Sequence, residues 1–196
     1  AAFVRWVKAG IADHGGDPKR VVAMGQSNGA VQLATYLGHG SGRSEEEAGL
    51  RGAILMGGAF NLLPLRLSVP DRFTEPGARA VPPPPMLGPP PMPPAAPIDP
   101  ATLLARSNLE GLKAQNIPIM VVAAELDPEE IVETVSLLGK QLCRPTLAVV
   151  PQHSHISQIT SFGTADETMS APVLSFIRSA AQPEPAGRCL KRAETP

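Results

Sequence analysis

The sequence has little that would suit a disulfide-rich, metal-binding or nucleotide-binding protein. Its 196 residues include only two cysteines, Cys143 and Cys189, which are too few for a disulfide scaffold and lack the spacing of a zinc finger. Neither of the glycine-rich phosphate-binding patterns, G-x-x-x-x-G-K and G-x-G-x-x-G, is present. We therefore expect neither a metal nor a nucleotide cofactor.

Charge of one sign and long apolar runs are also scarce. Lys and Arg number 17 and Asp and Glu 18, so no broad basic field exists to attract the phosphates of a nucleic acid. The longest apolar stretches, such as 117–124, are far shorter than the roughly 20 residues that span a bilayer, and no secretory signal pattern is visible. We expect a soluble protein with no nucleic-acid partner and no membrane span, and the cytoplasm as its default location.

Apolar residues and proline, by contrast, are abundant. Hydrophobic residues make up 43% of the chain and its mean hydropathy is +0.01, enough for the core of one domain. Residues 81–100 hold 11 of the 23 prolines, and such a run favours extended polyproline II over helix or strand. We expect a single domain over 1–181, with an insertion at 59–100, and a flexible tail at 182–196. The insertion is either a stiff disordered segment or a docking site for a proline-recognition partner.

The rest of the chain alternates between short apolar runs and amphipathic segments. Buried strands are expected at 20–24, 53–56, 117–124 and 146–150, and helices at 2–13, 28–37, 101–114 and 128–142. Such alternation predicts an α/β fold, a three-layer α/β/α sandwich around a mostly parallel sheet. Because the carboxyl ends of parallel strands share one edge, ligands and reacting groups are expected in the loops at that edge.

One of these loops carries a G-x-S-x-G pattern. Residues 25–29 read Gly-Gln-Ser-Asn-Gly, between an expected strand and an expected helix. In a nucleophile elbow the chain turns sharply around the serine, and small flanking residues give the turn its room. Gly25 and Gly29 are expected to supply that room, which makes Ser27 a candidate nucleophile.

A serine hydroxyl needs an imidazole to take its proton and a carboxylate to orient that imidazole. Asp127 follows the strand expected at 117–124, and His153 and His155 follow the strand expected at 146–150. The order serine, acid, histidine agrees with the elbow. Glu125 is an alternative acid, because strand alternation places it on the same side as Asp127. The same alternation leaves the choice between the two histidines open.

These motifs resemble the α/β-hydrolase superfamily, in its esterase branch of carboxylesterases and kynurenine-formamidase-like enzymes. The stretch GGDPKRVVAMGQSNGA is similar to the elbow region of those esterases, AELDPEEIV to their acid loop, and HSHISQITSFGTAD to their histidine loop. The resemblance implies a triad of Ser27, Asp127 and His155, since the second histidine matches the family position. It also implies that the Asn28 backbone N–H is an oxyanion donor. The insertion occupies the place where these enzymes carry a cap. Substrate contacts are expected in and around it, from Gln26, Phe60 and Leu62, with Leu63 and Leu65 beside them.

The chain departs from this family in its first part. Several strands precede the elbow strand in such enzymes, and a loop among them carries an HGGG-like motif that completes the oxyanion hole. Here His14-Gly15-Gly16 matches that motif only superficially, because it lies directly before the elbow strand in the position of the family's GGDP turn. The resemblance therefore covers the C-terminal portion of the fold, and the elbow strand is expected at an exposed sheet edge. The chain reads as a fragment or a natural truncation.

The motifs together predict a serine hydrolase that cleaves a small carboxylic ester, or an aryl formamide, through an acyl-enzyme. The small-molecule ester or amide substrate rests on the family likeness. The alternative is a catalytically inactive, truncated scaffold of the hydrolase fold that binds a partner through its proline-rich insertion. The missing oxyanion loop favours this alternative, because removing one oxyanion donor costs about 100- to 1000-fold in turnover.

Overall fold

The computed structural model describes residues 2–38, 49–62, 98–142 and 145–182. By its internal contacts the chain forms two compact units, one of Ala1–Phe60 with Asn108–Pro196 and the other of Asn61–Ser107. Most of the expected insertion and nearly all of the expected tail lie outside the described residues, and so do both cysteines, Leu63 and Leu65. Within the described residues, no helix is long and apolar enough to cross a membrane.

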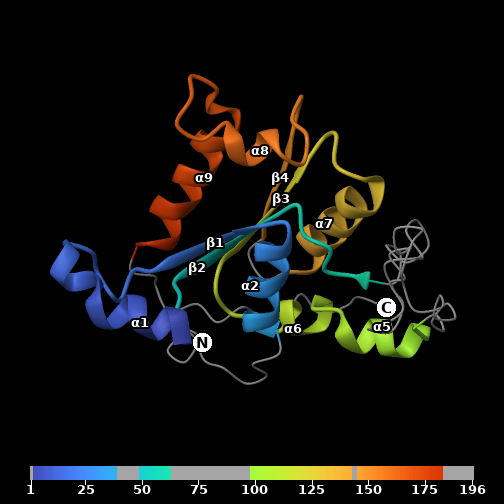
Figure 1. Ribbon diagram of the computed structural model, residues 1–196, viewed down its shortest axis with the longest axis horizontal. Helices are drawn as coiled ribbons and strands as arrows, with labels where there is room; N and C mark the ends of the chain where they lie inside the picture. Colours follow the sequence, from blue (N-terminus) through green and yellow to red (C-terminus); the bar gives the residue numbers. More distant parts are fainter. Residues whose placement is uncertain (1, 39–48, 63–97, 143–144, 183–196) are drawn as a thin grey trace, which may run out of the picture. The chain divides into compact units, whose positions relative to one another are not determined.

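The first unit is built on one parallel sheet, as the β/α alternation predicts (Figure 1). Its four strands lie in the order of the sequence, β1-β2-β3-β4. Their bounds are Val22–Gln26, Gly52–Met56, Ile119–Ala124 and Pro145–Val150. All three neighbouring pairs are parallel, so the four carboxyl ends meet at one edge.

Helices cover both faces of this sheet. The helices α2 (Asn28–Gly38), α6 (Leu109–Lys113) and α7 (Glu129–Gln141) pack over one core, and α9 (Glu167–Ala180) over the other (Figure 1). Consecutive residues of β3 serve both cores, with Val121 among the side chains of the first and Met120 among those of the second, because side chains alternate along a strand. The three-layer α/β/α prediction is confirmed.

The sequence misplaces two boundaries. The single helix expected at 101–114 is wrong, because α5 (Pro100–Arg106) ends before Ser107 and α6 begins at Leu109. Ser107 has an extended backbone, and its hydroxyl donates to the Leu103 carbonyl and accepts from the Leu62 N–H, which favours a turn over continued helix. The strand expected at 20–24 instead runs to Gln26, because its pairing with β2 continues to Met56.

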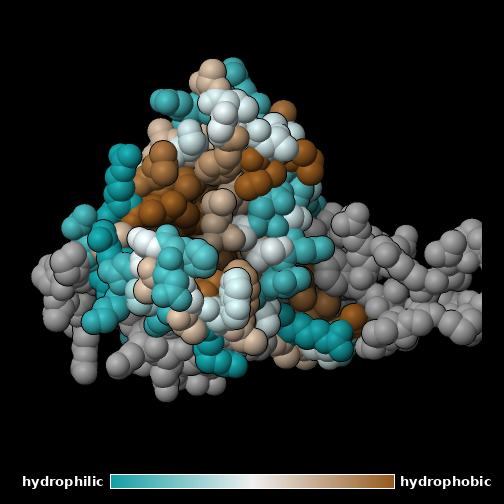
Figure 2. Space-filling view, turned by 60° about the vertical axis from the view of Figure 1, so that its left-hand side comes forward, coloured by the Kyte–Doolittle hydropathy of each residue, from teal (hydrophilic) through white to brown (hydrophobic). Residues whose placement is uncertain are grey.

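The elbow strand lies at an edge of the sheet, as expected. Among the described strands β1 pairs only with β2, and Met24 in its middle is 46% exposed. The N-terminal elements, α1 (Ala2–Gly10) and the 3-10 helix Ile11–His14, leave the stacked rings of Phe3 and Trp6 exposed as well. Figure 2 shows apolar side chains gathered on one face of the molecule.

Candidate active site

The three residues of the expected triad lie at the carboxyl edge of the sheet. Ser27 directly follows β1, while Asp127 and His155 lie in the loops after β3 and β4. Backbone hydrogen bonds tie these loops together, since the Ser27 N–H donates to the Met56 carbonyl at 2.8 Å and the Leu126 N–H to the His153 carbonyl at 3.0 Å. The parallel topology therefore brings residues that are up to 128 positions apart to the same edge.

Ser27 occupies a strained turn between β1 and α2. Its φ of 55° lies in the left-handed region, which costs a residue with a side chain roughly 1–2 kcal/mol. The helix begins at the next residue, and the Val31 N–H closes its first turn on the Ser27 carbonyl at 3.1 Å. Strain of this kind persists where surrounding structure enforces it, often at functional sites. This strand-turn-helix geometry is the one that a nucleophile elbow requires.

The two glycines of the elbow are not equivalent. A Cβ at Gly25 would overlap the Gly29 carbonyl and stand 2.7 Å from the Ala30 nitrogen. A Cβ at Gly29 would meet no atom within 4 Å among the neighbours that the structure describes. The prediction that both glycines make room is therefore correct for Gly25 alone, because α2 begins by crossing directly over that residue.

This asymmetry predicts opposite outcomes for two alanine variants. We expect Gly25→Ala to lower the free energy of unfolding by about 2–3 kcal/mol, as overpacking against backbone does. Gly29→Ala is expected to leave it unchanged or raise it by up to about 1 kcal/mol, because alanine favours helix. Urea unfolding of both variants measures the difference, and equal destabilisation would contradict the close crossing of β1 and α2.

His155 and Asp127 are joined by a short hydrogen bond. The His155 Nδ1 lies 2.6 Å from the Asp127 Oδ1. The carboxylate is fully buried, whereas the imidazole is 30% exposed. The second carboxylate oxygen, Oδ2, accepts the Ala124 N–H at 2.8 Å. This hydrogen bond fixes the orientation in which the carboxylate contacts the histidine. The pair leaves the other imidazole nitrogen, Nε2, facing away from the acid.

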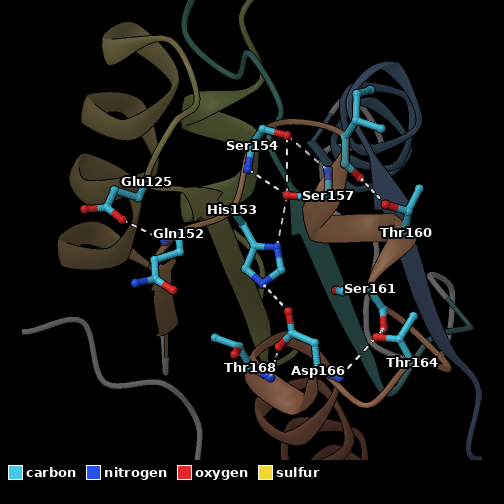
Figure 3. A network of polar contacts seen from close by, with 11 residues as sticks. Glu125, Gln152, His153, Ser154, Ser157, Thr160, Ser161, Thr164, Asp166 and Thr168 are labelled. Carbon is cyan, nitrogen blue, oxygen red and sulfur yellow. Dashed lines mark hydrogen bonds and ion pairs between the residues drawn. The ribbon is translucent and has the colours of Figure 1, made fainter.

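The two alternatives that the sequence left open have other partners. The Glu125 carboxylate accepts the Gln152 N–H at 2.7 Å. His153 is buried, with its Nδ1 3.1 Å from the Ser157 hydroxyl and its Nε2 3.2 Å from Asp166 Oδ2 (Figure 3). Neither side chain hydrogen-bonds to Ser27, Asp127 or His155, so among the described residues only Asp127 and His155 form an acid–imidazole pair next to the turn at Ser27.

Apart from the expected triad, Ser157, His153 and Asp166 form a second, hydrogen-bonded set of Ser, His and Asp residues, visible in Figure 3. Asp166 caps the N-terminus of α9 by accepting the Thr168 N–H at 2.9 Å. The hydroxyl and N–H of Thr168, and secondarily His153, lower the pKa of Asp166. The Ser157 oxygen also accepts the Ser154 N–H at 2.8 Å. This second set braces the histidine loop against α9.

The Ser27 hydroxyl makes no hydrogen bond with any residue of the described ranges. The serine–histidine contact of the expected triad is therefore not formed in this structure. Catalytic hydrogen bonds are often long in the absence of substrate and tighten in its complex.

The structure also places the remaining expected site residues. Asn28 is exposed and is the first residue of α2, where N–H groups lack partners within the helix. The Gln26 amide Nε2 donates to the His155 carbonyl at 2.9 Å. Phe60 is fully buried in the core beside α2. Leu62 lies in the other compact unit and is half-buried.

Sequence reasoning missed two residues that contact the His155 and Asp127 pair. Gln158, in α8 (Ser157–Thr160), is fully buried and donates to both the His155 carbonyl and Asp127. Gly57, after β2, packs against the imidazole with a φ of 55°. A glutamine three residues after the histidine and a glycine pair after a strand were the available signals. In the described part of the chain, no cluster of three or more His, Cys, Asp or Glu is placed to hold a metal ion.

Comparison with known proteins identifies the fold. No family model and no curated protein matches the sequence, but solved structures match the fold. Esterase 2 of Thermogutta terrifontis, a Planctomycetes species, is 17% identical over 90% of this chain and 59% of its own length, with a TM-score of 0.52. Its form phosphorylated by paraoxon is 18% identical over 92% and 62%, with a TM-score of 0.54. An acylaminoacyl peptidase is 14% identical over 92% and 27%, with a TM-score of 0.56.

The chain has the α/β-hydrolase fold. It spans about three fifths of the length of the esterase that it matches. The resemblance that the sequence motifs carry is thereby confirmed at the level of fold.

Proposed function

We propose that this chain carries the reacting residues of a serine hydrolase that acts on a small carboxylic ester or an aryl formamide. The observation that carries the proposal is the 2.6 Å contact of His155 Nδ1 with the buried Asp127, at the sheet edge where Ser27 stands in a left-handed turn. The matched solved structures, an esterase and an acylaminoacyl peptidase, support the same class of chemistry.

In the proposed mechanism His155 acts as general base. As the Ser27 oxygen attacks the substrate carbonyl carbon, the hydroxyl proton passes to His155 Nε2. Asp127 holds Nδ1 protonated and stabilises the imidazolium that forms. The negative charge on the carbonyl oxygen is stabilised in part by the Asn28 N–H, at the positive end of α2.

Collapse of the tetrahedral intermediate breaks the ester or amide bond. His155 Nε2 returns its proton to the leaving alcohol or amine, and the acyl group stays on Ser27 as an ester. Water then attacks that ester, His155 takes a proton from the water, and the acid product leaves as Ser27 regains its proton.

Covalent labelling tests the proposal directly. A folded sample treated with a fluorophosphonate is expected to gain the mass of one phosphonyl group, mapped by peptide mass spectrometry to Ser27, and to hydrolyse a short p-nitrophenyl ester. The esterase described as phosphorylated by paraoxon motivates the choice of probe. A folded sample that neither labels nor turns over the ester would contradict the hydrolase and favour the non-catalytic scaffold.

A further inference from the structure

The backbone carbonyl of His155 is held by two glutamine side chains. The Gln26 amide donates to it at 2.9 Å and the Gln158 amide at 3.1 Å. A carbonyl oxygen has two lone pairs, so both are occupied by side-chain donors. Gln26 belongs to β1 and immediately precedes Ser27, whereas Gln158 belongs to α8. Two separate elements thus fix the same backbone atom of the histidine.

Gln158 also contacts the acid. Its Nε2 lies 3.4 Å from Asp127 Oδ2, so one amide group contacts both members of the pair. The side chain is fully buried, and its Oε1 has no hydrogen-bond partner among the described residues. The amide orientation is set by its neighbours, because the reversed amide would turn an oxygen toward two acceptors. A buried unpaired oxygen costs about 1–3 kcal/mol, which a purely structural position would avoid with an apolar side chain.

Gly57 limits the space beside the imidazole of His155. A Cβ added there would stand 3.1 Å from both Cε1 and Nδ1 of His155 and 2.8 Å from the Gln158 amide nitrogen. Its φ of 55° is also in the region that favours glycine. The backbone after β2 therefore packs directly against the ring that contacts Asp127.

We propose that Gln26, Gly57 and Gln158 form a histidine seat that positions His155 between Asp127 and Ser27. These are positioning residues, because they contact the base and its acid rather than a substrate. Gln26 links the elbow strand to the histidine loop across 129 positions of sequence. The seat rests on the proposed function for its effect on catalysis, whereas its effect on the histidine can be measured without activity.

Gln26→Met and Gln158→Met test the seat, since methionine keeps the length of the side chain but removes the amide donors. Gln115→Met is the matched control, because Gln115 is also buried and donates to the backbone carbonyls of Leu37 and Gly111. For each variant we would measure kcat and KM on a p-nitrophenyl ester, together with the unfolding midpoint. We expect the two seat variants to lose about 10- to 100-fold in kcat with little change in KM, as small misplacements of reacting groups do, and the control to keep its kcat.

Proton NMR provides the readout that is independent of activity. The His155 Nδ1 proton, shared with a carboxylate at 2.6 Å, is expected far downfield and identified by its loss in His155→Ala. It should shift or broaden in Gln26→Met and Gln158→Met and stay in place in Gln115→Met. Gly57→Ala, whose Cβ would press on the ring, should shift it as well. An unchanged resonance and unchanged kcat in folded Gln26→Met would overturn the seat, and absence of turnover in the wild type alone would contradict only the hydrolase.

Discussion

Replacing Ser27 with alanine is expected to abolish fluorophosphonate labelling and ester hydrolysis while leaving the unfolding midpoint close to that of the wild type. The hydroxyl is the group that would form the covalent bond, and it has no hydrogen bond to any described residue, so its removal costs the fold little. Alanine at a φ of 55° carries a similar backbone cost to serine, so the variant isolates the effect of the hydroxyl.

Ser157→Ala is the informative companion, because Ser157 is the serine of the second set of Ser, His and Asp residues. Its oxygen already accepts the Ser154 N–H at 2.8 Å and lies within hydrogen-bond distance of buried His153. These hydrogen bonds give the hydroxyl a structural role in the histidine loop. We expect this variant to keep a labelled Ser27 and to unfold at a lower temperature. Labelling that persists in Ser27→Ala and disappears in Ser157→Ala would reverse the assignment of the two sets.

Asp127→Asn is expected to lower kcat by about 10⁴-fold, the scale seen when the orienting acid of a triad becomes an amide. The surroundings determine how the amide would lie. The Ala124 N–H and the Gln158 amide both donate at the position of Oδ2, so the asparagine oxygen takes that place and its NH₂ group faces His155 Nδ1. Nδ1 must then accept, and the ring proton moves to Nε2, which can no longer take a proton from Ser27.

The control for this variant is Glu125→Gln, at the acid that the sequence could not exclude. Its carboxylate accepts a backbone N–H from Gln152, and we expect kcat to change by less than about threefold, as for a surface substitution that leaves the site intact. Steady-state kinetics on a p-nitrophenyl ester compare the two variants, with unfolding midpoints measured alongside. A larger loss in Glu125→Gln than in Asp127→Asn would show that the acid has been misassigned.

Much of the fold was predictable because its signals are local. The strand-turn-helix around Ser27 is encoded by an apolar run, two glycines and an amphipathic segment that are contiguous in the chain. Where neighbours compete with local preference, prediction fails. The helix expected at 101–114 breaks at Ser107, whose hydroxyl bonds with the backbone of Leu62 and Leu103, and Leu62 is 45 residues away.

The site shows the same division. Residue types and chain order single out Ser27 and limit the acid and base to two candidates each, because these loops follow parallel strands. Alternation alone cannot choose between His153 and His155, since both point to the same side of the extended chain. The choice becomes visible only where Asp127 meets one ring and Asp166 the other. Gln26 was expected to contact substrate, and its bond to the histidine loop depends on a residue 129 positions away.

The sequence by itself determined the layered α/β architecture, the strand-turn-helix around Ser27 and the short set of candidate residues for the proposed chemistry, because periodicity, glycine placement and residue type are local properties. Only the tertiary structure decided which histidine pairs with which acid, which glycine is sterically required and where Phe60 and Gln26 lie. Those outcomes depend on contacts between loops that follow different strands. They are set by packing at the sheet edge and not by any pattern along the chain.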